Sequence, residues 1–363
     1  MGMVRRTAYG LAGALMVAAS TAMVNPATAQ AGTASAANAA HAAERAQAAP
    51  SRAELALRWA PIHYQDVDVT GAHALGGKSD FITRYDFDGN LNGRDNWDNA
   101  GSNTSAAVYY SVLETGTHYY LTYFFFHPRD WIDHPFFETE HENDGEGVLT
   151  IVQKDDSPYG VLKAAVTVAH TDFYSYVPAG SDWTNGSETI DGTLQLKASP
   201  HDSFQHPVTA QERGGHGLKA WPQYDIDGDG VVYYPTAGTS EAPSSPDDRD
   251  VRYELIDLFA SGGLWAQRTN TSLFANLGTF AGDTSGGCGQ GTWSCGVNSA
   301  NAPWGWDDGN DAVARGEIAS DPAKLVASYF KVPGPLDRSY THNPYSSAAA
   351  ALKAAQNLPP TID

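Results

Sequence analysis

Short apolar and β-branched runs separated by turn residues dominate the first half of the chain. The runs 106–114 (AAVYYSVLE) and 118–126 (HYYLTYFFF) flank the turn TGT, which predicts a β-hairpin. Both runs are almost wholly apolar or aromatic, so we expect the hairpin to be buried on both faces. Further strands are predicted at 148–152, 160–170 and 172–178. Many short strands with little helix predict an all-β fold, mainly an antiparallel β-sandwich with a few short helices.

Helical patterns are short and lie near the two ends of this region. Residues 53–59 (AELALRW) predict a short helix that leads into a strand at Trp59–Tyr64. Residues 323–330 place their apolar side chains on one face and follow Pro322, a residue that suits the first turn of a helix. We therefore expect a second short helix here, capped by Ser320 or Asp321.

The N-terminus has the features of an export signal. Arg5 and Arg6 precede the apolar run 8–19, and Ala27 and Ala29 supply an A-x-A cleavage pattern. We therefore expect residues 1–29 to be a signal peptide and the protein to be secreted and extracellular. The apolar run is too short to span a bilayer, so no transmembrane segment is expected.

The rest of the chain divides into three further segments. Residues 30–52 are mostly alanine and small polar residues, which predicts a linker or propeptide. Residues 53–345 are long enough for a single large β-sandwich domain with loop insertions. Residues 346–363 form an alanine-rich C-terminal tail that we expect to be weakly attached.

The net negative charge of the chain restricts the classes of molecule that it can bind. The formal net charge is −20 at pH 7, and removing residues 1–29 takes away two arginines and no acid, which gives −22. Such acidity argues against nucleic acid, whose phosphates require a basic surface. It also argues against electrostatic docking on anionic lipid unless bound cations bridge the two.

The two cysteines predict a local cross-link. Cys288 and Cys295 lie in GGCGQGTWSCG with six residues between them. In an exported chain the expected interpretation is one disulfide that closes a glycine-rich loop. The spacing is not that of a C-x-x-C metal or redox site, although a reactive thiol stays an alternative.

Acidic residues and histidines gather before the strand at 148–152. His141, Asp144 and Glu146 form an H-x-x-D-x-E pattern, and residues two apart on a strand share a face, so Asp144 and Glu146 should point the same way. Carboxylates with one histidine suit a divalent cation, of which calcium is the expected one, with magnesium or manganese as alternatives. A solvated acidic loop is the other interpretation of the same pattern.

Two more acidic loops have calcium-type spacing. Asp225, Asp227 and Asp229 place carboxylates at alternate positions before a glycine, with the Val231 carbonyl at the seventh position, but no glutamate follows at the twelfth, so this is not an EF-hand. Asp86, Asp88 and Asn90 alternate in the same way. For this third loop, an asparagine- and aspartate-rich turn bonded to itself is an equal alternative.

The segment EHENDGE at 140–146, followed by GVLTIV, resembles the GHRHDWE motif of the necrosis- and ethylene-inducing protein-like family of secreted cytolysins. It also resembles the H-E-G-D-W-E motif of the vacuolar protein sorting protein 62 family. Pro128-Arg129-Asp130 matches the Pro-Lys-Asp that ends the preceding strand in the cytolysins. The resemblance covers residues 57–175 and implies a metal ion held by Asp130, His141, Asp144 and Glu146.

Two departures from the cytolysin motif bear on toxicity. The second histidine of the motif is Asn143 here, and its tryptophan is Gly145. The loop from Asp130 to His141 is also a few residues longer. Metal binding is compatible with these changes, whereas they put cytolytic activity in question.

Three functions follow from these residues. The first is a secreted, metal-binding β-sandwich that binds a glycan or lipid head group at a metal-centred surface site. The second is a metal-dependent hydrolase in which His141, Glu146 or His216 acts as base, which requires an open coordination position. His216 lies in GGHG, which fits a site that a ligand approaches closely or a surface turn. The third is a calcium-stapled extracellular structural protein.

Overall fold

The structure is a computed structural model that describes residues 49–132, 140–282, 295–296 and 300–346. The predicted signal peptide, nearly all of the linker and nearly all of the tail lie outside the described residues. The chain separates into two compact units, Met1–Ala49 and Pro50–Asp363, and the fold described below belongs to the second.

The described part of the second unit consists mainly of strands. Its helices are α2 (Arg52–Trp59), α3 (Asn96–Asn99), α4 (Glu317–Ser320) and α5 (Pro322–Tyr329), with 3₁₀ turns η1 (Leu75–Asp80), η2 (Leu264–Gln267) and η3 (Pro303–Gly305). The strands are β1 (Ile62–Asp66), β2 (Ala107–Thr115), β3 (His118–Trp131), β4 (Glu140–Gln153), β5 (Val161–Ala169), β6 (Asp172–Pro178), β7 (Thr184–Asn185), β8 (Ile190–Leu194), β9 (Leu196–Ala198), β10 (Gln205–Gln211), β11 (Leu218–Ala220), β12 (Gly230–Thr236), β13 (Val251–Asp257), β14 (Phe274–Asn276), β15 (Thr279–Phe280), β16 (Cys295–Gly296), β17 (Phe330–Lys331) and β18 (Tyr340–His342).

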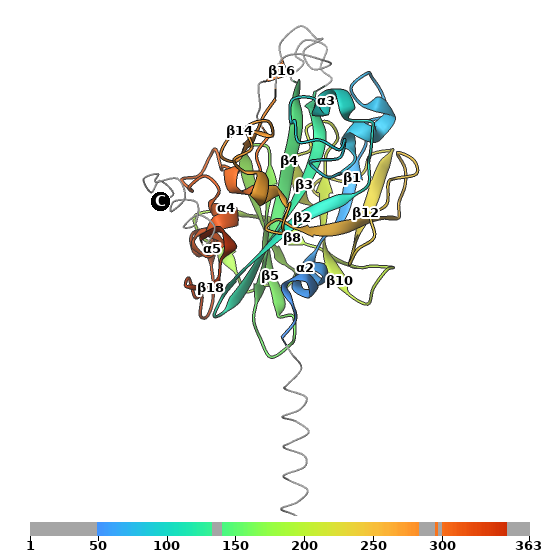
Figure 1. The fold of residues 1–363 in the computed structure, drawn as a ribbon. Coiled ribbons are helices and arrows are strands. Elements are labelled where there is room, and N and C mark those ends of the chain that lie inside the picture. The colour runs from blue at the N-terminus through green and yellow to red at the C-terminus, as the bar shows by residue number, and fades with distance from the viewer. Residues whose placement is uncertain (1–48, 133–139, 283–294, 297–299, 347–363) are drawn as a thin grey trace, which may run out of the picture. The chain divides into compact units, whose positions relative to one another are not determined.

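One large mixed sheet carries the fold, with the order β11-β10-β1-β12-β13-β2-β3-β4-β5-β6-β8 (Figure 1). Its centre is the antiparallel meander β2 to β6, which contains the predicted hairpin. The two ends of the sheet approach each other, because β11 contacts β4, β5 and β8. The sheet is thus nearly closed on itself.

The predicted antiparallel sandwich is therefore only partly correct. The protein is mainly β, but β1–β10, β12–β13, β13–β2 and β6–β8 are parallel pairs within the same sheet. Hydrophobic alternation reports which residues face the core and not which strands pair, so it could not distinguish two stacked sheets from one curled sheet.

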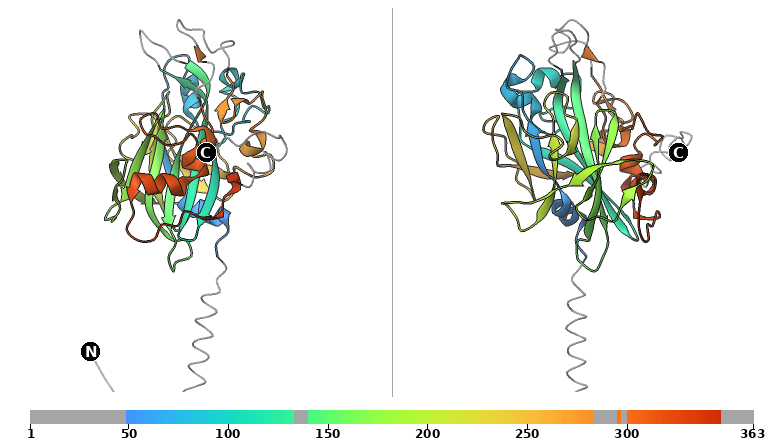
Figure 2. Two further views of the ribbon diagram at one scale, coloured as in Figure 1. Left: turned by 90° about the vertical axis from the view of Figure 1, so that its left-hand side faces the viewer. Right: turned by 180° about the vertical axis from the view of Figure 1, so that it is seen from behind.

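Both faces of the central strands are buried, as the apolar runs predicted. Alternate residues of β3 enter different cores: Phe124 packs with the C-terminal residues Trp306 and Leu325 on one face, and Phe125 packs with Val231 on the other. The second core fills the inside of the curled sheet. The first lies under the C-terminal segment, which covers one face of the central strands in both views (Figure 2).

The two predicted short helices are present. Ser51 caps α2 in a capping box, in which the Glu54 N–H donates to Ser51 Oγ and the Glu54 carboxylate accepts from the Ser51 N–H. Asp321 stands at the N-cap position of α5 and Pro322 follows at its first turn, but the Asp321 side chain does not make the expected capping hydrogen bond. No helix in the described ranges has the length and apolarity needed to cross a bilayer.

Candidate functional site

The β3–β4 pair extends past the core and carries the predicted site at its end. Its register is regular, with Asp130 opposite His141 and His127 opposite Asp144. Asp130 and His141, two of the ligands implied by the family resemblance, therefore lie side by side. β16 pairs with β4 at Glu140 and His141, so the backbone of the cysteine-bearing segment adjoins the motif.

Asn143 interrupts the ordinary strand conformation of β4 between His141 and Asp144. Its φ is 61°, in the left-handed region, and its side chain is buried. The Asn143 amide donates to the carbonyls of Gly93 (2.8 Å) and Ala281 (3.0 Å). Asn143 is thereby tied to two neighbouring loops at the point where β4 carries the motif.

Gly145 stands where the cytolysin motif has tryptophan, and the structure gives a packing reason. A Cβ at this position would lie 2.4 Å from Phe124 Cε2 and 3.0 Å from the Asn301 carbonyl oxygen. The Trp306 indole N–H donates to the Gly145 carbonyl at 2.8 Å. A tryptophan from the C-terminal segment thus packs against this part of β4.

His216 is buried at the centre of the site, so the surface-turn interpretation of its glycine neighbours is wrong. Its Nδ1 is 2.9 Å from Asp144 Oδ2 and its Nε2 is 3.1 Å from Asp80 Oδ1. Because carboxylate oxygens only accept, both ring nitrogens donate and the ring is charged. Burial disfavours this charge, but the hydrogen bonds to Asp144 and Asp80 outweigh it and raise the pKa of His216 to about 10.

Asp80, the last residue of η1, is the second carboxylate that His216 contacts. Its Oδ1 also accepts from the Gly214 N–H (2.7 Å), and its Oδ2 accepts from the Asp68 N–H (2.8 Å). The three donors satisfy a carboxylate that is fully buried. η1 and the β10–β11 turn are thereby joined to β4.

A neutral histidine stacks on this charged ring. The His127 and His216 rings are parallel, with centroids 3.8 Å apart. His127 Nε2 donates to Gln211 Oε1 at 3.1 Å, and the Gln211 amide donates to the His216 carbonyl. Burial, then the charge on His216, lowers the pKa of His127 well below its usual range.

Gln211 links the same network to a second neutral histidine. His63 Nε2 donates to Gln211 Oε1 at 3.1 Å, and His63 Nδ1 accepts from the Thr209 hydroxyl at 3.0 Å. Burial is the main cause that lowers the pKa of His63 to about 3. Around Gln211, the inside of the curled sheet is therefore lined by polar side chains that carry no charge.

Asp130 and His141 form an ion pair. His141 Nε2 is 3.4 Å from Asp130 Oδ2, and its Nδ1–H points at the Asn143 carbonyl oxygen, 3.0 Å away. Although burial opposes both charges, Asp130 raises the pKa of His141 to about 9, and His141 lowers the pKa of Asp130. The ring is protonated as it stands and would release a proton on binding a metal.

Glu146 is the least satisfied acid of the motif. Its Oε1 accepts from the His170 backbone N–H at 2.9 Å, whereas its buried Oε2 finds no partner among the described residues. Burial, then the charge on Asp144, raises the pKa of Glu146 well above its usual range. The His170 ring turns away and binds Glu212, with Nε2 2.7 Å from Oε1.

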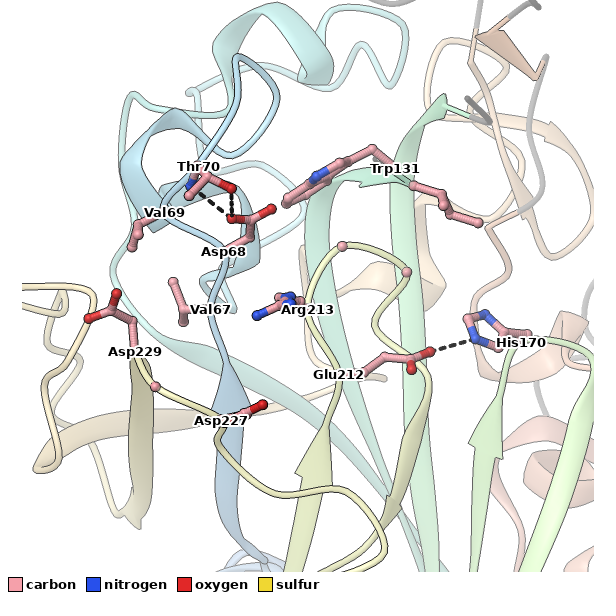
Figure 3. Close-up of a pocket in the computed structure, with 14 residues that line it drawn as sticks. Val67, Asp68, Val69, Thr70, Trp131, His170, Glu212, Arg213, Asp227 and Asp229 are labelled. Carbon is pink, nitrogen blue, oxygen red and sulfur yellow. Dashed lines mark hydrogen bonds and ion pairs between the residues drawn. The ribbon is translucent and has the colours of Figure 1, made fainter. Parts of the chain in front are cut away.

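An open pocket of about 630 Å³ adjoins this cluster (Figure 3). Its wall is shared with the site, because Trp131, His170 and Gly214 all line it. The remaining lining comes from loops on the strands that curl over the central meander: 67–70, 212–213, 215 and 227–229, together with Ile132. Arg213 extends into the space between Asp68 and Asp227.

The donor chemistry of the motif fits a hard divalent cation, although the side chains are not arranged around one. Within the described ranges, no three His, Cys, Asp or Glu side chains are arranged to hold an ion as they lie. The unpartnered Glu146 oxygen and the adjoining carboxylates of Asp130 and Asp144 are nonetheless hard ligands. The His216 N–H on Asp144 is the kind of outer hydrogen bond that orients a ligating carboxylate. Metal binding stays a prediction.

The third predicted calcium loop is bonded to itself. Asp86 accepts from Arg84 (2.9 Å), and Asp88 accepts from the amides of Asn90 (2.6 Å) and Asn99 (2.8 Å). The alternative of a self-bonded turn therefore describes the side chains as they lie. A calcium ion at Asp86, Asp88 and Asn90 stays a prediction.

The second predicted calcium loop leads straight into β12. Asp225 accepts from the Trp221 indole (2.9 Å) and the Ile226 N–H (2.8 Å). Asp227 and Asp229 line the pocket instead, while Val231 is buried in β12. Calcium binding here also stays a prediction, as does the disulfide, because Cys288 lies outside the described residues.

Sequence reasoning missed four residues of the cluster, namely Asp80, His127, Gln211 and Glu212. Asp80 comes from η1, and Gln211 and Glu212 from the end of β10, so the curl of the sheet brings them to the motif, whereas His127 lies opposite Asp144 in the β3–β4 pair. His127 gave a signal in retrospect, since it is a polar residue at the end of an aromatic strand. Asp80, between serine and phenylalanine, gave none.

No protein-family model and no curated protein matches the sequence. Solved structures of the necrosis- and ethylene-inducing protein-like family do match, in agreement with the motif resemblance. Necrosis and Ethylene inducing Protein 2 from the causal agent of cocoa's Witches Broom disease is 12% identical over 61% of this chain and 90% of its own, with a TM-score of 0.26. NLPPya in complex with glucosamine is 17% identical over 56% and 74%, with a TM-score of 0.26. A structure named "Toxin fold for microbial attack and plant defense" is 15% identical over 56% and 75%, with a TM-score of 0.28. The vacuolar protein sorting protein 62 resemblance stays a prediction.

Proposed function

We propose that this protein is a secreted, divalent-metal-binding β protein that binds a glycan at the motif end of β3 and β4. The observation that supports this most is a 630 Å³ pocket that shares a wall with the buried acid–histidine cluster. Asp130, Asp144 and Glu146, with His141 after it loses a proton, would hold the ion. The bound ion would supply a positive centre that sugar hydroxyls can ligate.

The pocket has the chemistry of a sugar site. Asp68, Glu212, Asp227 and Asp229 offer acceptors for hydroxyl groups, and Arg213 offers donors. Val67 and Ile132 add apolar surface for the carbon face of a ring. Because carboxylates outnumber the single guanidinium, the pocket favours neutral or amine-bearing sugars over an anionic lipid head group, which would need the ion as a bridge.

Calorimetry on the purified chain without residues 1–29 tests this proposal. Glucosamine, the ligand in the NLPPya structure, is the first compound to titrate, with and without calcium. The double variant Asp144→Asn, Glu146→Gln should lose one equivalent of calcium and bind glucosamine about 10–100-fold more weakly. Asp156→Asn, an exposed acid outside the site, is the matched control and should bind like wild type.

Two results would contradict the proposal. One is the same calcium stoichiometry in the double variant and in wild type. The other is glucosamine binding that is unchanged when calcium is removed, because the ion would then take no part in holding the sugar.

A further inference from the structure

His170 lies in the wall of the pocket with an unusual backbone conformation. Ala169 and Asp172 are paired in the β5–β6 hairpin, so His170 and Thr171 form its two-residue turn. The φ of His170 is 59°, in the left-handed region. Two-residue hairpin turns with positive φ favour glycine or asparagine, which adopt this conformation more easily than histidine. The contacts of the histidine ring are therefore the place to look for a function.

Two hydrogen bonds hold His170, one at its backbone and one at its ring. The backbone N–H donates to Glu146 Oε1 at 2.9 Å, and the ring Nε2 donates to Glu212 Oε1 at 2.7 Å. The side chains of His170 and Glu212 are 52% and 34% exposed, and both line the pocket, where Figure 3 shows them in contact. The pair is therefore accessible to a ligand, while its backbone end is tied to the motif.

The glycines on either side of His216 leave room for this pair. A Cβ at Gly217 would lie 2.8 Å from Glu212 Oε1 and 2.9 Å from His170 Nε2. A Cβ at Gly215 would lie 3.1 Å from His170 Cε1. Any larger residue at Gly217 would therefore displace the two side chains from each other. The GGHG segment accommodates the pair as well as the buried His216 ring.

We propose that His170 is a positioning residue of the pocket, which holds Glu212 in the orientation that accepts a hydrogen bond from a sugar hydroxyl or amine. This inference rests on the proposed function, because it requires a sugar in the pocket. A free glutamate side chain samples several rotamers and loses this freedom when a ligand binds. The bond from His170 restricts Glu212 before the sugar arrives, and such preorganisation raises the affinity for the sugar.

A double-mutant cycle tests the inference, with glucosamine titrated by calorimetry into the full chain. The variants are His170→Asn, Glu212→Ala and the two combined. Asparagine tolerates the left-handed conformation and keeps the backbone N–H on Glu146, but its side chain is too short to replace the ring. His170→Asn should bind glucosamine about three- to tenfold more weakly. Its calcium stoichiometry and melting temperature should match those of wild type.

The combined variant distinguishes positioning from direct contact with the sugar. Glu212→Ala should weaken glucosamine binding at least about tenfold, because it removes a charged acceptor. The combined variant should bind like Glu212→Ala alone, since His170 has no effect once Glu212 is gone. His201→Asn is the matched control, because His201 forms the same kind of pair with Asp250 outside the pocket lining. The control should bind like wild type.

Gly217→Ala disturbs the pair without removing either member. It should weaken glucosamine binding about as much as His170→Asn does. Gly101→Ala is its control, because a Cβ at Gly101 would meet only Leu75, at an ordinary contact distance of 3.7 Å. This control should bind glucosamine like wild type.

The inference is wrong if His170→Asn binds glucosamine like wild type. It is also wrong if the losses of the two single variants multiply in the combined variant. Sugar binding that needs no calcium contradicts the proposed function alone, because the cycle run without calcium still decides the role of His170. A wild-type chain that binds no glucosamine contradicts both.

Discussion

His216 bridges two carboxylates that come from distant parts of the chain, and the cost of burying each charge depends on the other two residues. Asp80 and Asp144 are both buried, and neither forms an ion pair with a lysine or arginine in the described ranges. The charged ring therefore compensates two acids at once. Removing one member of such a group is far more damaging than the net stability of the group suggests.

His216→Ala should lower the free energy of unfolding by about 3–5 kcal/mol, because it leaves two buried carboxylates without a counter-charge. Urea denaturation at pH 7 measures this. His201→Ala is the matched control, since His201 pairs with Asp250, whose side chain is 62% exposed. The control should lose less than about 1 kcal/mol. Equal losses in the two variants would show that the His216 bridge adds no more than a surface pair.

At the scale of elements, the path of β4 depends on one residue, Asn143, that has an unusual backbone conformation. Asn143 adopts φ 61°, and its side chain bonds to Gly93, Asn96 and Ala281, which tie two separate segments, residues 93–96 and the loop at Ala281, to the strand. Asparagine tolerates this conformation better than most residues and also supplies the hydrogen bonds. The position that is histidine in the cytolysin motif therefore has a structural role here.

Asn143→Ala should be less stable than Asn143→Gly by about 1–2 kcal/mol. Both variants lose the same side-chain hydrogen bonds, but only alanine is destabilised by the left-handed backbone conformation, which glycine adopts freely. Thermal or urea melts of the pair measure the difference directly. Equal stability of the two variants would mean that the strand relaxes to an ordinary conformation at this position.

At the scale of the whole molecule, global stability should depend on histidines that are buried without charge. His118 is fully buried at the start of β3, between Trp183 and Tyr120. Burial, then the charges on Lys163 and Lys154, lowers its pKa to about 4. In the unfolded chain the same ring has a pKa near 6.5. Between pH 4 and pH 6.5 the ring is therefore protonated in the unfolded state and neutral in the folded state.

The contribution of His118 is therefore complete above about pH 6.5 and is lost as the pH falls towards 4. Between pH 7 and pH 5 it should reduce the free energy of unfolding by about 2 kcal/mol. Urea melts of wild type and His118→Asn at both pH values isolate this effect from the general titration of the acidic surface. An unchanged pH dependence in the variant would refute it.

The sequence was most informative where local chemistry decides the outcome. The turn TGT between two aromatic runs determines the β2–β3 hairpin, and the apolar spacing of 53–59 and of 323–330 after Pro322 predicted α2 and α5. The family resemblance placed Asp130 and His141 in one ligand set, but their opposition across β3 and β4 follows from the extension of β4 back to Glu140, which the apolar pattern did not predict.

Only the tertiary structure decided the environment of those residues. Asp80 and His216 are 136 positions apart, and parallel pairs such as β1–β10 bring them together. Pairing of distant strands depends on how the whole sheet curls, which no local pattern encodes. The sequence by itself therefore determined the strands and their acids, and the tertiary structure decided which acids share a site.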